Sequence, residues 1–185
     1  KIGRAAFEGC NLLTNIVLPE KLETIEYSAF EGCAALTNIT IPANVTSIGN
    51  NIFKNCSSLE AVTFGENSKL TYIPQEAFIG TIIKNIVIPA SVEEIHWGAF
   101  ENLTSLESVV FEENSKLKSL NDYAAFRGCT GLTAITLPAS LETLGCDSFR
   151  GCTNLITVTF EEGSNLSKIG RAAFEGCNLL TNIVL

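Results

Sequence analysis

The 185-residue chain contains no methionine, one tryptophan and one histidine, and a single histidine excludes a metal site that needs two histidine ligands from this chain. Positive charge is also scarce: 12 lysine and arginine residues stand against 20 aspartate and glutamate residues, which gives a net charge of −8. Affinity for nucleic acid comes largely from excess lysine and arginine. The sequence therefore excludes a general phosphate-binding surface, and nucleic acid is not an expected partner.

Several motifs are also missing from the chain. No apolar run approaches the roughly 20 residues of a membrane helix, so we expect no membrane insertion by this segment. No glycine-rich phosphate loop, nucleophile elbow or HExxH zinc motif occurs. His96 lies beside Trp97 and near Glu94, but the ladder cysteine that could complete a dyad is replaced by Leu103, so we predict a solvent-facing imidazole. We expect no enzymatic activity, no metal and no cofactor.

What the chain does contain is a repeat. Three phenylalanines, Phe64, Phe111 and Phe160, share one position within it, and the other eight recur at spacings of 22 to 26 residues. A period in this range is typical of a solenoid, in which each unit buries its apolar face by stacking on its neighbours. The eight recurring residues, called the ladder phenylalanines below, are Phe7, Phe30, Phe53, Phe78, Phe100, Phe126, Phe149 and Phe174.

Each repeat also contains a short alternation of polar and β-branched residues, as in Asn38–Ile41. Period-2 alternation predicts a strand, and each repeat should add one strand in parallel to the last. In four repeats a proline follows this strand, and in three the strand ends in phenylalanine and runs into a longer acidic loop. Because proline lacks an amide donor, it should stop the hydrogen-bonded ladder. The four prolines are Pro19, Pro42, Pro89 and Pro138.

Residues 1–18 and 168–185 are identical, and the offset of 167 residues equals seven repeats. Two origins stay open: a longer protein with tandem 167-residue blocks, or an engineered duplication. We interpret 1–185 as a single continuous solenoid of about eight repeats of 22–26 residues, in which 168–185 starts the next block. Neither end shows an atypical capping repeat, and an uncapped parallel sheet is a template for end-to-end pairing.

The unit from Leu22 to Pro42, Leu-x-x-Ile-x-x-x-Ala-Phe-x-x-Cys-x-x-Leu-x-x-Ile-x-Ile-Pro, resembles the BspA-like (treponemal-type) leucine-rich repeats. The match covers essentially the whole chain, with local departures such as Thr81 and Leu103 in place of the repeat cysteine. The resemblance implies a right-handed leucine-rich-repeat superhelix with a concave parallel β-sheet and short helical or 3₁₀ turns on the convex side. It also implies an extracellular or cell-surface protein that acts in adhesion.

Seven cysteines invite several interpretations. Six of them follow a ladder phenylalanine by three residues, and this phase predicts buried rungs that act as small apolar fillers with weak S–H donors. Disulfides between adjacent rungs are disfavoured by parallel side-chain directions, and a metal site is disfavoured by the spacing of one thiol per coil. Cys146 is out of phase, so we predict an exposed thiol that could cross-link chains. The six rungs are Cys10, Cys33, Cys56, Cys129, Cys152 and Cys177.

The outward positions of the predicted strands form a candidate binding face that is small, flat and almost uncharged. It lacks the tyrosine, tryptophan and arginine of a hot-spot interface, and suits low-affinity multivalent contact or lateral packing. Two functions stay open: an extracellular scaffold that holds proteins or glycans at a cell surface, or a structural protein whose copies stack end to end into a rod or filament. The candidate residues are Asn15, Asn38, Thr40, Thr63, Asn85, Thr136, Thr159 and Asn182.

Overall fold

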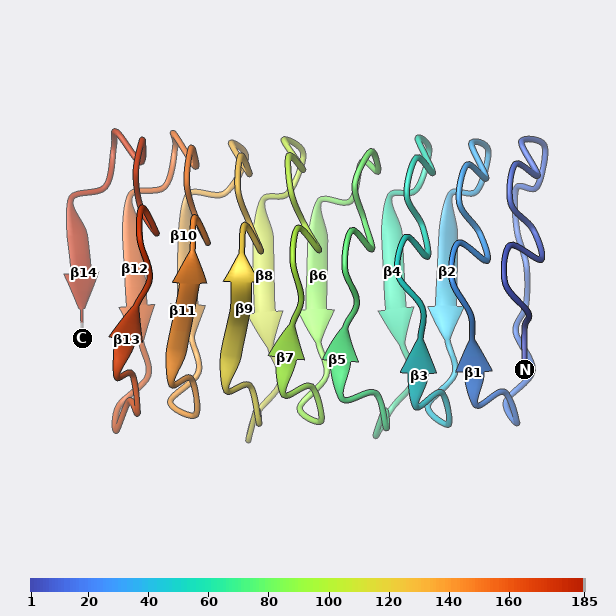
Figure 1. Cartoon of the computed structure of the whole chain (residues 1–185), viewed down its shortest axis with the longest axis horizontal. Helices are drawn as coiled ribbons and strands as arrows, with labels where there is room; N and C mark the ends of the chain where they lie inside the picture. The colour runs from blue at the N-terminus through green and yellow to red at the C-terminus, as the bar shows by residue number, and fades with distance from the viewer. Residues whose placement is uncertain (185) are drawn as a thin grey trace.

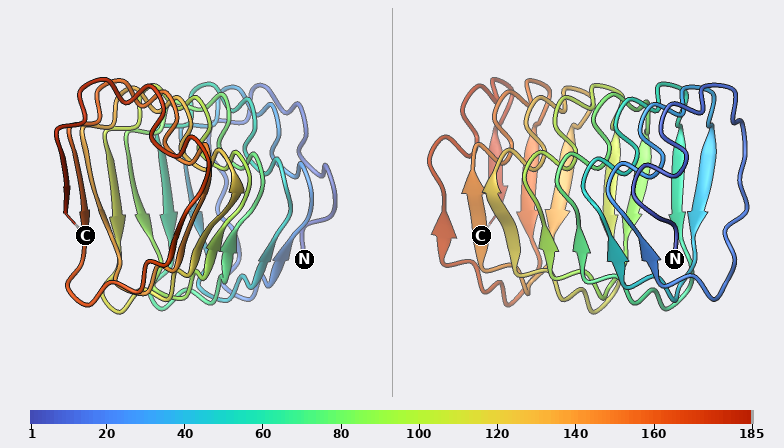
Figure 2. Two further views of the ribbon diagram at one scale, coloured as in Figure 1. Left: turned by 60° about the vertical axis from the view of Figure 1, so that its left-hand side comes forward. Right: turned by 45° about the vertical axis from the view of Figure 1, so that its right-hand side comes forward.

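The computed structural model describes residues 1–184, so the apolar rung predicted at Leu185 lies outside the described residues. The chain winds into coils that stack in one row, with the N-terminus at one end and the C-terminus at the other (Figure 1). Each complete coil has a long strand on one side and a short strand on the other, joined by a turn segment and a loop (Figure 2). The predicted parallel solenoid is confirmed.

The long strands are the strands that the alternation predicts. In β2 the side chains of Ile39 and Ile41 are buried and those of Asn38 and Thr40 are exposed, so one face of the strand points into the coil. Pairing is parallel and in register, as between β2 and β4. The long strands are β2 (Asn38–Ile41), β4 (Ala61–Phe64), β6 (Asn85–Ile88), β8 (Ser108–Phe111), β10 (Ala134–Leu137), β12 (Thr157–Phe160) and β14 (Asn182–Val184).

Proline decides where the long strands are hydrogen-bonded to each other. In the pairs β2–β4, β6–β8 and β10–β12, the amide of Gly65, Glu112 or Glu161 donates to the carbonyl that ends the earlier strand, at 2.8–3.0 Å. The equivalent residues after β6 and β10 are Pro89 and Pro138, which have no amide to donate. The ladder is accordingly interrupted between β4 and β6 and between β8 and β10, although these strands lie against each other.

A second row of strands, which the sequence analysis did not predict, faces the viewer in Figure 1. It forms a two-stranded and a five-stranded parallel sheet, and the interruption falls at Pro74, where again the later coil has no amide. We call this row the short-strand sheet. Its members are β1 (Thr24–Ile25), β3 (Ser47–Ile48), β5 (Tyr72–Ile73), β7 (Glu94–Ile95), β9 (Ser119–Tyr123), β11 (Thr143–Cys146) and β13 (Lys168–Ile169).

The ladder phenylalanines form a continuous stack through the core, as predicted. Neighbouring rings lie 4.9–6.0 Å apart between centroids, with interplanar angles of 0–23°. The backbone follows the same order, because the amide of each ladder phenylalanine from Phe7 to Phe149 bonds a carbonyl in the next coil, as from Phe100 to Ala125 at 2.9 Å. Stability therefore depends on contacts between adjacent coils.

The segments around these phenylalanines are turns, and no helix occurs among the described residues, so the expectation of helical or 3₁₀ turns was wrong. Residues two before and two after each ladder phenylalanine have positive φ, as Ser28 (54°) and Gly32 (70°) do around Phe30. A left-handed residue breaks the series of helical hydrogen bonds and turns the amides toward the next coil. Glycine or asparagine occupies the later position in every repeat, because both tolerate this conformation.

The cysteine rungs are buried as predicted, with one exception. From Cys33 onward, each ladder thiol donates to a ladder phenylalanine carbonyl of the preceding coil, at 3.0–3.1 Å. Burial raises the pKa of Cys56 and of Cys152 to about 12. Cys10 is exposed, so its predicted burial was wrong: residues 1–18 form the first coil of this chain, and no preceding coil covers the thiol. All seven cysteines are free.

Candidate binding surfaces

The structure places the eight predicted binding residues on the outer side of the long strands. Seven of them are exposed and Thr159 is half-buried. The strand register brings several side by side, since Thr40 lies opposite Thr63 and Thr136 lies opposite Thr159. Asn15 precedes the first long strand and lines the same open groove as Asn38. Each of these coils thus presents a small neutral side chain to solvent at an equivalent position of its long strand.

The proline interruptions shape this face into shallow grooves. One groove of about 370 Å³ lies over β4, β6 and β8, and Val87 and Val110 line it with about half of their surfaces exposed. Another of about 370 Å³ runs between β8 and β10 and includes Thr136. Neither groove holds a basic side chain or a tyrosine, tryptophan or histidine. The face therefore offers hydrogen bonds and modest apolar contact, without the anchors typical of tight binding.

The opposite face, over the short-strand sheet, carries the aromatic residues that the long-strand face lacks. All three tyrosines, the tryptophan and the histidine of the chain belong to it. Tyr27 is 56% exposed, Trp97 48% and Tyr123 47%. The sequence analysis did not identify a site at these residues. The signal was present, because the tyrosines and the tryptophan occupy two outward rows of the repeat, that of Tyr27, Trp97 and Tyr123 and that of Tyr72.

His96 is packed more closely than predicted. Its ring stacks on Tyr72 with 5.0 Å between centroids and 8° between planes, and its side chain is 32% exposed, so the imidazole faces solvent on one side only. The Nε2 atom lies 3.1 Å from Glu94 Oε2, and the same oxygen accepts a hydrogen bond from Asn121 Nδ2 at 3.2 Å. The tyrosine Oη lies 3.3 Å from Ser47 Oγ. These contacts hold the two rings in one orientation.

Cys146 ends β11, opposite Tyr123, and its side chain is half-buried, so the thiol is less exposed than predicted.

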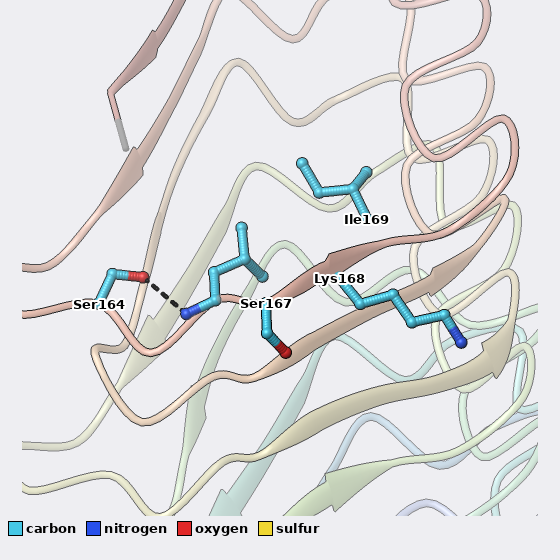
Figure 3. A pocket seen from close by; sticks show the side chains of 5 residues that line it. Ser164, Ser167, Lys168 and Ile169 are labelled. Atoms are coloured by element: carbon cyan, nitrogen blue, oxygen red, sulfur yellow. Dashed lines mark hydrogen bonds between the residues drawn. The ribbon is translucent and has the colours of Figure 1, made fainter.

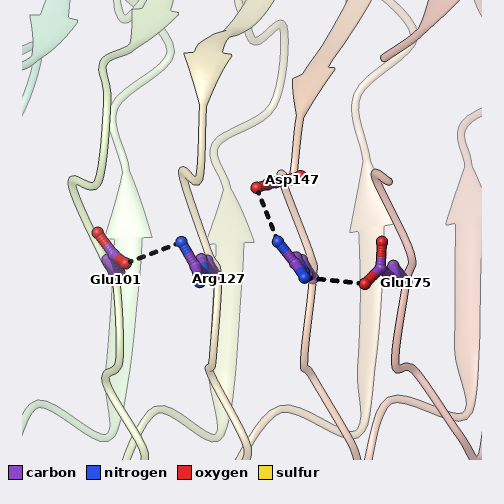
Figure 4. A network of polar contacts seen from close by, with 5 residues as sticks. Glu101, Arg127, Asp147 and Glu175 are labelled. Atoms are coloured by element: carbon purple, nitrogen blue, oxygen red, sulfur yellow. Dashed lines mark hydrogen bonds and ion pairs between the residues drawn. The ribbon is translucent and has the colours of Figure 1, made fainter. Parts of the chain in front are cut away.

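The residue after Cys146, Asp147, is buried, and its Oδ2 lies 3.5 Å from Arg150, which also bonds Glu175 at 2.9 Å (Figure 4). Asp147 Oδ1 has no hydrogen-bond partner. This ion-pair network joins adjacent coils, and the described structure shows no histidine–cysteine contact in it that would support catalysis.

A further hollow of about 270 Å³ lies beside β13 and is lined by residues that include Ser164, Lys168 and Ile169 (Figure 3). Ile169 is 48% exposed there because β13 is paired on one side only within the described residues. The hollow is thus a property of a strand that is paired on one side only among the described residues. Among residues 1–184 no group of three or more histidine, cysteine, aspartate or glutamate residues is placed to bind a metal. The same residues include no helix with the length and hydrophobicity of a membrane span.

Comparison with known sequences identifies the repeat. The sequence pattern described as a BspA type leucine rich repeat region of six copies matches residues 1–107 and 98–185. No curated protein matches the chain. The predicted leucine-rich-repeat fold is therefore confirmed in its family as well as in its architecture.

Solved structures of bacterial proteins are similar to this chain. A leucine rich repeat protein of T. pallidum is 28% identical, with a TM-score of 0.78 over 90% of this chain and 77% of that protein. A leucine rich cell surface protein of Faecalibacterium prausnitzii is 28% identical, with a TM-score of 0.62 over 90% of this chain. The pneumococcal vaccine antigen PcpA is 29% identical, with a TM-score of 0.60 over 89% of this chain and 43% of the antigen. The chain spans about half (52%) of the Faecalibacterium protein.

Proposed function

Because the chain belongs to the BspA-type leucine-rich repeat family, we propose that it is an extracellular or cell-surface scaffold for protein–protein interaction and adhesion. The fold is that of bacterial surface leucine-rich repeat proteins, and repeat solenoids of this family are generally non-enzymatic. Two outward faces that run along the whole row of coils carry the proposal. The backbone amides and carbonyls of adjacent coils bond each other, so the outward side chains of both faces are left to contact partners.

The repetition itself favours multivalent binding. Equivalent outward side chains recur about every 4.8 Å along the row, which is the spacing of neighbouring strands. Weak contacts at several coils act together, because the first contact raises the effective concentration for the next. A partner with a repeated or extended surface would therefore gain the most from this arrangement.

The scaffold function is tested by biolayer interferometry with the immobilised chain and a panel of purified extracellular-matrix proteins and mucins. We expect saturable binding to at least one panel member and slower dissociation from a surface that carries the ligand at high density. Absence of saturable binding to every panel member at tens of micromolar would contradict the proposal.

A second candidate, end-to-end assembly, is favoured by the duplicated segment. In residues 1–18 one side of the coil packs on the next coil, where Phe7 stacks on Phe30 at 5.2 Å. In residues 168–184 the opposite side packs on the preceding coil, where Phe174 stacks on Phe149 at 5.5 Å. One 18-residue sequence thus fits a neighbour on either side. The C-terminal segment of one copy could replace the identical N-terminal segment of the next and continue both sheets.

Light scattering and negative-stain microscopy at rising concentration test this assembly. Each added copy should lengthen a rod by seven coils, or about 34 Å at 4.8 Å per coil. A variant that ends at residue 167 should assemble at lower concentration than the full chain, because no segment must be displaced. If both chains are folded by circular dichroism and stay monomeric at every concentration, assembly is excluded for this chain.

A further inference from the structure

One groove on the short-strand face combines aromatic walls with negative charge. It has a volume of about 450 Å³ and lies over β1, β3 and β5. We call it the aromatic groove. Its lining includes Glu26, Tyr27, Gly49, Tyr72 and His96.

The walls of the groove stand on coils that flank the coil of β3. Tyr72 and His96 belong to adjacent coils and their rings stack, so the ring normals lie along the row of coils. His96 therefore covers one face of Tyr72, and both residues line the groove. Tyr27 belongs to the coil of β1, two coils away from Tyr72, and also lines the groove. Both tyrosines thus border the same space.

The floor of the groove carries no side chain at Gly49. A Cβ atom at this position would lie 2.2 Å from the backbone nitrogen of Tyr27, so the neighbouring coil leaves room for glycine alone. Gly49 therefore lets the coil of β3 lie close against the coil of β1, and no side chain rises from this position between the two tyrosines.

Two carboxylates supply the charge beside these rings. Glu94 does not line the groove itself but contacts His96, which does, and among residues 1–184 no lysine or arginine is within ion-pair distance of Glu94. Glu26 lines the groove and pairs with Lys1 at 2.6 Å, and this contact holds the pKa of the glutamate below its ordinary value. The chain as a whole carries a net charge of −8, which attracts positively charged partners.

We propose that the aromatic groove binds an arginine or lysine side chain presented by an extended basic segment of a protein partner. A cation over a tyrosine ring is attracted by the negative ring face, and a planar guanidinium can also stack on it. The carboxylates of Glu26 and Glu94 complement the same charge. The inference rests on the proposed scaffold function and adds to it a surface and the chemistry of the partner.

The chain supplies its own optical probe, because Trp97 is its only tryptophan and follows His96 directly. Tryptophan fluorescence is recorded while a Gly-Arg-Gly-Arg-Gly peptide is added, with a citrulline peptide as the neutral isosteric control. We expect saturable binding of the arginine peptide that weakens with added salt, and no binding of the citrulline peptide. Both titrations use the full chain.

Variants on the two faces locate the site. Y72A and Y27A should each weaken binding about tenfold, since a partly desolvated cation–aromatic contact has this magnitude. Y72F should keep the affinity because the ring face is retained, and E94Q should weaken binding and reduce its dependence on salt. T133A, at an exposed position directly before β10 on the long-strand face, should change nothing. Because Y72A could disturb the stack on His96, the more exposed Tyr27 keeps the test independent of local packing.

The proposal is overturned if the citrulline peptide binds as tightly as the arginine peptide, or if T133A weakens binding as much as Y27A does. It is also overturned if a neutral oligosaccharide such as maltohexaose binds and the arginine peptide does not. Binding to the matrix panel that persists in Y27A and E94Q would leave the scaffold function standing and exclude this groove. Failure of the whole panel contradicts the scaffold function separately.

Discussion

Removal of one central phenylalanine should show that the stack carries the stability of the solenoid. Phe78 is 2% exposed and stacks on Phe53 at 6.0 Å and on Phe100 at 5.0 Å. Truncation of a buried phenylalanine to alanine removes its transfer free energy and leaves a cavity, at a cost of about 3–5 kcal/mol. We therefore expect F78A to lower the free energy of unfolding by this amount.

The loss should also have a defined position. Coils contact only their neighbours, so hydrogen exchange should accelerate first in the coils of β5, β3 and β7. F7A is the matched control, because Phe7 is half-buried and stacks on one ring only. Its expected cost is about 1–2 kcal/mol, in proportion to the smaller apolar area that it buries.

The measurement is urea unfolding followed by circular dichroism, with hydrogen exchange detected by mass spectrometry. Unchanged unfolding in F78A would refute the assignment of the phenylalanines as the structural ladder. So would a cost in F7A equal to that in F78A, since the reasoning requires a difference between one and two stacked neighbours.

Three further predictions concern thiols and proline. At pH 8 a thiol reagent should label Cys10 and Cys146 rapidly, and the buried cysteines only after unfolding. The reason is that a buried thiol with a pKa of about 12, such as Cys56, is almost entirely protonated at this pH. Peptide mapping of the labelled chain measures this difference. An unfolded thiol ionises near pH 9 and the folded Cys56 thiol near pH 12, so the free energy of unfolding should fall as pH rises from 9 to 12. The loss for this residue is about 4 kcal/mol. C56A should show a weaker dependence on pH in urea unfolding at pH 9, 10 and 11. P89A should restore an amide that can donate a hydrogen bond to the Phe64 carbonyl. The free energy of unfolding should stay nearly unchanged, because the new hydrogen bond offsets the added conformational freedom of the unfolded chain. Rapid hydrogen exchange at residue 89 would show that proline does not cause the interruption.

Much of the core could be predicted from the sequence because every coil offers the same environment. The isoleucine of β2 and its equivalents alternate with polar residues over four positions, which is long enough for a period-2 pattern to identify a strand. The cysteines share one phase with the phenylalanines, and their burial follows from that phase. Cys10 departs from it because burial needs a neighbouring coil as well as a place in the repeat.

The short strands could not be predicted in the same way. β1, β3, β5, β7 and β13 contain two residues each, which is too few for a periodic signal. The turns were assigned wrongly because their amides bond the next coil, about a repeat away in sequence, so local propensity does not decide their conformation. The recurrent glycine or asparagine two residues after each phenylalanine was the available signal for a left-handed turn.

By itself, the sequence determined that the chain is a line of stacked coils, which residues form the core and where proline punctuates the strands. These properties follow from hydrophobic period and from the chemistry of single residues. Only the tertiary structure decided that proline separates neighbouring coils, that His96 stacks on Tyr72, and that the aromatic residues share one face with Glu94. The physical reason is that such contacts join residues of different coils, and their geometry depends on how one coil is placed on the next.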